Sequence, residues 1–392
     1  MPPSRRPLNT RIARSSLRFK FTELTDSELA LQAEVRAFLA AELPRGEFTP
    51  GLGMAAPRDQ EFSRKLARRG WLGMALPSEY GGRDGSAVER FVVVEELLRW
   101  GAPVGFHWVA DRQTGPVIAR FGTEEQKRRF LPAICRGELS FSIGMSEPEA
   151  GSDLASVGTR AVRVDGGWSV TGTKIWTGGA HLNDWFVVLC RTSEEEDRHA
   201  GLSQLIVDLK SPGLDARPIP YMDGNAFFCE VTLDEVFVPD ELVLGEIGSG
   251  WIQNTSELAF ERAGPERWLS TYLLVEQFVR EGRVADAAAH EAVGQALGEW
   301  WAIRALSLSV ARLIDQGEAP AAESALVKEL GTRFEQRVLD SVWRLVDVEP
   351  ALGCGSEFER LLAASVLMAP SYTIRGGTNE ILRSVAGRAL QG

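Results

Sequence analysis

Side-chain periodicity changes twice along this chain of 392 residues, and the changes restrict the folds open to it. Before about residue 139, apolar residues recur at the three- and four-residue spacing of amphipathic helices. From there to about residue 242, short runs rich in Val, Phe and Thr alternate with turn residues, as in strands. The helical spacing then returns. The order predicts an α+β fold with an N-terminal α-helical domain at 23–138, a middle antiparallel β domain at 139–242 and a C-terminal α-helical bundle at 243–392.

Local signals place single elements within these zones. Thr25–Glu28 and Thr123–Gln126 have the pattern of a capping box, in which a hydroxyl and a carboxyl or amide group satisfy free N–H groups at a helix start. Asp165-Gly-Gly167 is a hairpin-type turn, and the strands around it suggest a small barrel or sandwich. Further helices are expected at about 59–70, 86–100, 287–316 and 321–347, and further strands at 185–190, 204–209 and 227–233.

Charge and cysteine usage exclude several classes of function. The net charge of −11 and the pI near 5.1 argue against nucleic acid or an anionic membrane as the main partner, because either needs a basic face. Four dispersed cysteines and four histidines form no zinc pattern, so no metal site is expected and a reducing cytoplasm fits best. No apolar run approaches the roughly 20 residues that span a bilayer.

The first 22 residues carry six basic side chains and no acid. Such a segment is either a transit peptide or a disordered basic tail. The tail is favoured, because neither a cleavage signal nor a clear apolar face accompanies the charges.

Two motifs in the β zone carry a family resemblance. The first is Phe141-Ser-Ile-Gly-Met-Ser-Glu-Pro-Glu-Ala-Gly-Ser-Asp153, and about 20 residues later comes Thr171-Gly-Thr-Lys-Ile-Trp-Thr-Gly-Gly-Ala180. Together they resemble the flavin-binding signature of the acyl-CoA dehydrogenase family. A C-terminal Gly376-Gly-Thr-Asn-Glu-Ile-Leu-Arg383 belongs to the same resemblance, which runs from about residue 22 to 390. It implies an acyl-CoA dehydrogenase-like fold and FAD as cofactor.

The flavin roles also follow from the side chains themselves. An isoalloxazine ring needs a flat apolar wall, which Trp176 can supply, and hydrogen bonds, which Ser146 and Thr177 can supply. Gly151 and Ser152 suit close approach of the backbone to a diphosphate or to CoA. Each residue alone is more simply turn or core chemistry, but the two motifs at this spacing favour flavin. The expected cofactor-binding residues are Met145, Ser146, Gly151, Ser152, Trp176, Thr177, Thr378 and Glu380.

Oxidation of an acyl-CoA needs a base for the α-proton. In the resembled family the carboxylate occupies one of two positions, and the C-terminal position is Gly376 here, so that base is absent. The other position corresponds to Glu261, which we expect to be the catalytic base, with Glu257 as the fallback. We expect Glu261 to share an apolar helix face with Leu258, Trp268 and Leu269, which would raise its pKa, and Pro265 to kink that helix.

The same resemblance supplies the expected reaction and its substrate contacts. FAD-dependent α,β-dehydrogenation would give the trans-2-enoyl-CoA, with the β-hydride passing to flavin N5. Ser152 and Arg262 are the expected substrate-binding residues. The small residues Ala259, Ala263 and Gly264 near the base would widen the pocket for a bulky acyl group. A plain alternative for Glu261 is a surface carboxylate beside Arg262.

The sequence departs from the family in the residues that one subunit contributes to the flavin site of its neighbour. Homotetrameric members carry Arg-x-x-Phe-Gly and a Gln-x-x-Gly-Gly loop there, whereas this chain has Val279-Arg-Glu-Gly282 and Pro350-Ala-Leu-Gly-Cys-Gly355. This pattern resembles one subunit of the bacterial α2β2 acyl-CoA dehydrogenases that act on steroid or other bulky acyl-CoAs. The expected partners are acyl-CoA, a paralogous subunit and electron-transfer flavoprotein. A homomer with drifted contacts, a flavin oxidase or monooxygenase, and a non-catalytic scaffold subunit are the alternatives.

Overall fold

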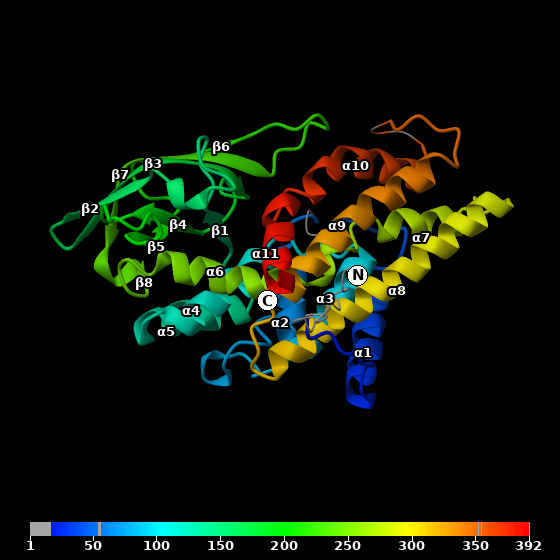
Figure 1. The fold of residues 1–392 in the computed structure, drawn as a ribbon, viewed down its shortest axis with the longest axis horizontal. Helices are drawn as coiled ribbons and strands as arrows, with labels where there is room; N and C mark the ends of the chain where they lie inside the picture. The colour runs from blue at the N-terminus through cyan, green and yellow to red at the C-terminus, as the bar shows by residue number, and fades with distance from the viewer. Residues whose placement is uncertain (1–16, 54–55, 352, 354, 392) are drawn as a thin grey trace, which may run out of the picture.

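The computed structural model describes residues 17–53, 56–351, 353 and 355–391. Its N-terminal part is helical, as predicted (Figure 1). Capping boxes at Thr25, Ser86 and Thr123 start three of the helices, and Gly101 ends one of them in the left-handed conformation. The helices are α1 (Asp26–Glu42), α2 (Gln60–Arg68), α3 (Ala87–Trp100), α4 (Gly115–Phe121) and α5 (Glu124–Cys135), with a π-helical turn, η2 (Ala110–Thr114), before α4.

The middle part forms one sheet in the order β6-β7-β3-β2-β4-β5-β8, with β1 added beside β4. The predicted turn at 165–167 joins β2 to β3 as a hairpin. The expectation of a wholly antiparallel sheet is wrong, since β1 and β2 each pair with β4 in parallel. The strands are β1 (Phe141–Gly144), β2 (Arg160–Val164), β3 (Gly167–Gly178), β4 (Trp185–Arg191), β5 (Leu202–Asp208), β6 (Leu214–Pro218), β7 (Phe228–Pro239) and β8 (Val243–Leu244).

The C-terminal part returns to helices, which are α6 (Gly250–Glu261), α7 (Tyr272–Arg280), α8 (Ala287–Asp315), α9 (Ala321–Trp343), α10 (Glu357–Tyr372) and α11 (Asn379–Gln391). One prediction fails here. Pro265 does not kink a continuing helix, because α6 ends at Glu261 and Pro265 begins a separate 3-10 turn, η5 (Pro265–Arg267). Trp268 and Leu269 therefore lie beyond α6, and the predicted helix face that they share with Glu261 does not exist.

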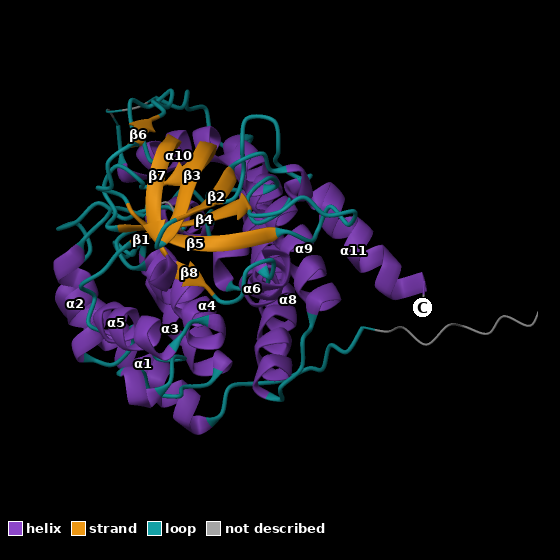
Figure 2. Ribbon diagram, turned by 90° about the vertical axis from the view of Figure 1, so that its left-hand side faces the viewer, coloured by secondary structure: helices purple, strands orange, loops and turns teal. Residues whose placement is uncertain are grey.

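Helices from both ends of the chain share one apolar core, while the sheet has its own. Phe91 of α3 packs near Trp268, and Trp300 of α8 packs edge-on against Phe334 of α9 within that core. A second core lies between the sheet and α4–α5. Figure 1 shows the sheet at one end of the molecule, beside the helices, and Figure 2 views the molecule from that end, with the sheet in front of the helices. The helical zones at the two ends of the sequence thus pack as one body.

The prediction of a disordered tail is wrong for residues 17–22. Arg18 donates from its backbone N–H and its side chain to Glu323 of α9, and the Lys20 backbone N–H donates to Ser309 of α8, so residues 17–22 lie against these helices. The rest of the predicted tail lies outside the described residues. No helix in the described ranges combines the length and apolar character needed to cross a bilayer.

Candidate active site

Trp176 occupies an unusual backbone position at the end of β3. Its φ is +60°, in the left-handed region, and the register between β3 and β7 shifts between Lys174 and Thr177, which marks a bulge. A bulky residue rarely takes this conformation, and such strain persists where function requires it. The bulge leaves the Trp176 side chain 55% exposed, with Phe228 edge-on at 6.2 Å. The result is a flat apolar surface that faces outward.

Thr177, the next residue, is fully buried. Its hydroxyl has no hydrogen-bond partner among the described residues. A buried hydroxyl without a partner costs free energy, so this atom is suited to a polar ligand group. An exposed aromatic wall beside an unsatisfied hydroxyl fits the edge of a flavin ring, which needs both.

A buried ion pair ties the two motifs together. The Lys174 Nζ lies 2.7 Å from the Glu147 carboxylate and also donates to the Met145 carbonyl oxygen. Burial alone would raise the pKa of Glu147, but the Lys174 ammonium, with N–H donors from Gly158 and Thr159, holds that pKa below its usual value. The sequence analysis did not single out this pair, although both residues lie inside the quoted motifs.

The other predicted flavin residues of the first motif lie beside this pair. Ser146 is half-buried, and its carbonyl oxygen accepts the backbone N–H of Ile175, which joins the two motif segments directly. Met145 is half-buried, whereas Gly151 and Ser152 are exposed on the following loop. Open space surrounds Gly151, so a ligand can reach its backbone there. The structure therefore brings Met145, Ser146, Trp176 and Thr177 into one region.

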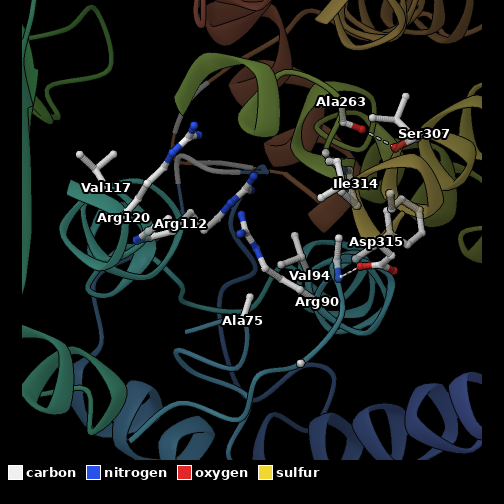
Figure 3. A pocket seen from close by; sticks show the side chains of 18 of the residues that line it. Ala75, Arg90, Val94, Arg112, Val117, Arg120, Ala263, Ser307, Ile314 and Asp315 are labelled. Carbon is white, nitrogen blue, oxygen red and sulfur yellow. Dashed lines mark hydrogen bonds between the residues drawn. The ribbon is translucent and has the colours of Figure 1, made fainter. Parts of the chain in front are cut away.

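A cavity of about 360 Å³ lies between α3, α4, α8 and the segment that follows α6. Phe91, Val94 and Val310 line its apolar sides. Ala263 and Gly264 line it where the chain leaves α6, and Figure 3 shows Ser307 donating to the Ala263 carbonyl oxygen. The predicted small residues thus widen the cavity at these two positions, while the side chain of Ala259 lies outside the described residues.

Arginines interrupt this apolar lining, and the sequence analysis missed them. Figure 3 shows the side chains of Arg90, Arg112 and Arg120 extending toward the cavity from α3, η2 and α4. Arg112 is buried 2.5 Å from the Glu266 carboxylate. Burial opposes the charge on Glu266, but Arg112 keeps its pKa below the usual value, so the two remain an ion pair.

The conformation of the C-terminal loop leaves no room for a side chain, and so for a catalytic carboxylate, at position 376. Gly376 has a φ of +68°, and a Cβ there would lie 2.6 Å from Nη2 of Arg267, a fully buried side chain. The Arg267 guanidinium thus fills the space that a side chain at position 376 would need. Arg262, the predicted substrate residue, is half-buried and donates from Nε to the Gly376 carbonyl oxygen at 3.3 Å.

The remaining predicted residues lie at the start of α11 and in α6. Thr378 and Glu380 stand at the start of α11, which packs chiefly on α9, so the structure places them with the helical bundle. Glu261 is the last residue of α6, but its side chain and that of Glu257 lie outside the described residues.

Family models match nearly the whole chain. They are the N-terminal, middle and C-terminal domains of acyl-CoA dehydrogenase, at residues 25–138, 142–236 and 270–391. The chain belongs to the acyl-CoA dehydrogenase family. It is 35% identical to acyl-CoA dehydrogenase IpdE1 of Mycobacterium tuberculosis over 386 residues, covering 92% of this chain and 96% of that protein. Acyl-CoA dehydrogenase FadE34 of the same organism is 34% identical over 374 residues, and this chain spans about half, 51%, of its length.

Solved structures of acyl-CoA dehydrogenases share the fold. The Tcur3481-Tcur3483 steroid ACAD superposes with a TM-score of 0.81 at 30% identity, covering 93% of this chain and 97% of that one. The ChsE4-ChsE5 complex from M. tuberculosis gives 0.81 at 26% identity, covering 94% and 98%. The predicted fold class and the predicted enzyme class, an acyl-CoA dehydrogenase, are thereby confirmed.

Proposed function

We propose that this acyl-CoA dehydrogenase carries out FAD-dependent α,β-dehydrogenation of a bulky acyl-CoA. The observation that carries the proposal is the pairing of a strained, outward-facing Trp176 with the buried, unsatisfied Thr177 hydroxyl. Neither feature stabilises the chain by itself, and both fit a flat ligand with a polar edge.

The chain's own residues would hold the cofactor in three ways. Trp176 stacks on the flavin ring, and the Thr177 hydroxyl and Ser146 hydrogen-bond its edge. The open backbone at Gly151 and the exposed Ser152 approach a diphosphate or the CoA moiety. Met145, Thr378 and Glu380 complete the proposed set. Bound FAD supplies the acceptor for the β-hydride of the substrate.

Glu261 is the proposed base that removes the α-proton. Two facts support it. Position 376 holds glycine, with Arg267 in the space beside it, so no carboxylate can act from there. Glu261 ends α6 two residues before Ala263, which lines the cavity, so a substrate in that cavity has its reacting carbons close to this part of the chain. Arg262 would hold the substrate beside it.

The partner is proposed to be a paralogous subunit in an α2β2 heterotetramer. The described residues of α7 and of the loop before α10 lack the Phe-Gly and Gln-x-x-Gly-Gly elements that complete a neighbour's flavin site in homotetrameric members. The related ChsE4-ChsE5 complex contains two different chains. A steroid-type acyl group agrees with the steroid ACAD relative. We further propose electron-transfer flavoprotein as the acceptor and the cytoplasm as the location.

The test is purification of the chain alone and with a paralogous subunit, followed by flavin quantitation and native mass measurement. The expected result is a yellow heterotetramer with two FAD that a steroid side-chain acyl-CoA bleaches without oxygen. Rapid peroxide formation in air would favour an oxidase. A complex without flavin would favour the scaffold role, and a fully active homotetramer with four FAD would refute the heteromer.

A further inference from the structure

The C-terminal loop, residues 373–378 between α10 and α11, is anchored at both ends by one buried lysine. Lys328 of α9 is fully buried, and its Nζ donates to the carbonyl oxygens of Thr373 and Gly377 at 3.1 and 2.8 Å. The same Nζ donates to Oδ1 of Asn379, the first residue of α11, at 2.7 Å. An ammonium group has three N–H donors. Lys328 can therefore satisfy all three acceptors and join the loop to α9, on which α11 also packs (Figure 1).

A second contact joins the middle of the loop to the segment that follows α6. The Arg375 guanidinium donates to the Glu335 carboxylate of α9 at 3.0 Å and to the Ser270 hydroxyl at 2.8 Å. The other oxygen of that carboxylate accepts the backbone N–H of Ser270. Arg375 also donates to the carbonyl oxygen of Glu266. The loop and the segment after the proposed base thus share α9 as their buried support.

Arg262, the residue directly after the proposed base, packs on this loop. Its Nε donates to the Gly376 carbonyl oxygen at 3.3 Å, and a Cβ at Gly377 would lie 3.3 Å from its Nη2. Gly377 has a φ of +90°, which glycine alone adopts without strain. The carbonyl groups of the loop therefore divide between two cations, with Gly376 binding Arg262 and Gly377 binding Lys328.

We propose that Lys328 and Arg375 are positioning residues, which act through the C-terminal loop to hold Arg262 ready for acyl-CoA. An arginine side chain has many rotamers, and a group that is ordered before its ligand arrives binds that ligand more tightly. The inference rests on the proposed function, in which Arg262 binds the substrate. It gives a role to a loop that carries no catalytic carboxylate in this chain.

The protonation of Lys328 decides the conditions of the test. Burial and the nearby guanidinium groups of Arg267 and Arg375 lower the pKa of Lys328 to about 7. A neutral amine has only two N–H donors for the three acceptors. Binding is therefore measured at about pH 6, where the ammonium form predominates.

The test is a double-mutant cycle on the holoenzyme complex, with Lys328→Met and Arg262→Gln made singly and together. The Kd of cholanoyl-CoA, a steroid acyl-CoA, is measured by calorimetry on dithionite-reduced holoenzyme, which cannot oxidise it. Lys328→Met should raise this Kd about fivefold when Arg262 is present and hardly at all in Arg262→Gln, because the lysine acts through the arginine. Arg375→Gln should behave in the same way.

Arg333→Gln is the matched control, because Arg333 lies on α9 but its side chain is 55% exposed in a surface pair with Glu329. It should leave the Kd unchanged. If Lys328→Met does not fold, as judged by flavin content and native mass, Asn379→Ala replaces it, since that change removes only one of the three acceptors of Lys328. A smaller rise in Kd is expected there, again only when Arg262 is present.

An equal rise in Kd with and without Arg262 would mean a general structural role and would overturn the inference. An unchanged Kd in the anchor variants, or no binding of cholanoyl-CoA to the parent complex, would overturn it too. Failure of the proposed function looks different. If cholanoyl-CoA bleaches the oxidised flavin while the two effects are additive, the dehydrogenation stands and the positioning role is lost. If the cycle shows coupling but no acyl-CoA bleaches the flavin, the positioning role stands and the reaction is lost.

Discussion

Replacing Trp176 with alanine separates the cofactor role of this residue from any structural one. A tryptophan side chain has about 250 Å² of surface. With 55% exposed, Trp176 offers roughly 140 Å² to a ligand. If a flavin ring covers half of that area, the alanine variant loses about 1.7 kcal/mol of flavin-binding free energy at about 25 cal/mol per Å². That loss raises the Kd roughly twentyfold. If the ring covers the whole area, the loss is about 3.5 kcal/mol and the Kd rises a few hundredfold.

The assay is flavin retention by the purified complex, measured by absorbance after gel filtration and by titration of FAD into apoprotein. Phe237→Ala is the matched control, because Phe237 is 52% exposed on β7 of the same sheet but lies near the β2–β3 turn, away from the motifs. We expect weaker flavin binding only in the Trp176 variant. An unchanged Kd and spectrum in Trp176→Ala, or an equal loss in both variants, would refute the assignment.

A second substitution at this position tests the backbone argument. At an ordinary strand position, glycine is less stable than alanine by about 0.5–1 kcal/mol. At the left-handed backbone of Trp176, any residue other than glycine costs about 1–2 kcal/mol. Apoprotein with Trp176→Gly should therefore unfold at the same urea concentration as Trp176→Ala or a higher one. A clearly lower midpoint for the glycine variant would mean that the strain is relieved elsewhere.

Three further predictions follow from the site and its surroundings. Glu261→Gln should keep its flavin while flavin reduction by acyl-CoA slows by about 10²–10⁴, and turnover within a few-fold of wild type would redirect attention to Glu257. Gly376→Glu should fail to restore turnover to Glu261→Gln and should lower the unfolding free energy by at least about 1–2 kcal/mol. The reason is that the left-handed backbone and the Arg267 guanidinium both oppose a side chain at position 376. Recovered turnover in the double variant would contradict this. Burial lowers the pKa of His107 to about 4, below its usual 6.5, so the unfolded chain binds the extra proton and stability should fall as pH drops from 6.5 to 4. Urea titrations should show this slope flattened in His107→Asn, and an unchanged slope would argue against a buried neutral imidazole.

Local chemistry in the sequence was enough to predict most elements. The capping boxes at Thr25 and Thr123 and the turn at Asp165–Gly167 each depend on a few neighbouring residues, so their spacing could be recognised directly. The same holds for the two motifs, which one backbone hydrogen bond joins, from the N–H of Ile175 to the carbonyl oxygen of Ser146.

Features that depend on distant contacts were not predictable in this way. The parallel pairing of β1 with β4 involves segments about 40 residues apart, and no local pattern encodes its direction. The end of α6 before Pro265 was misread, because a proline is compatible with either a kink or a helix stop. The cavity arginines come from three separate elements, and only packing shows that Arg90 and Arg120 share a cavity.

The ion pair between Lys174 and Glu147 limits which amino-acid substitutions evolution can accept at these two positions. The two residues belong to different motifs, yet each is buried with the other as its counterion. Replacing either one alone leaves a buried charge without its counterion. This lowers the folding stability by about 3–5 kcal/mol, a large share of the stability of a typical domain. Mutational paths away from this pair must therefore alter both codons together or pass through a poorly folded intermediate. A recombination junction between residues 147 and 174 would face the same barrier, so the two motifs are expected to be inherited as one unit.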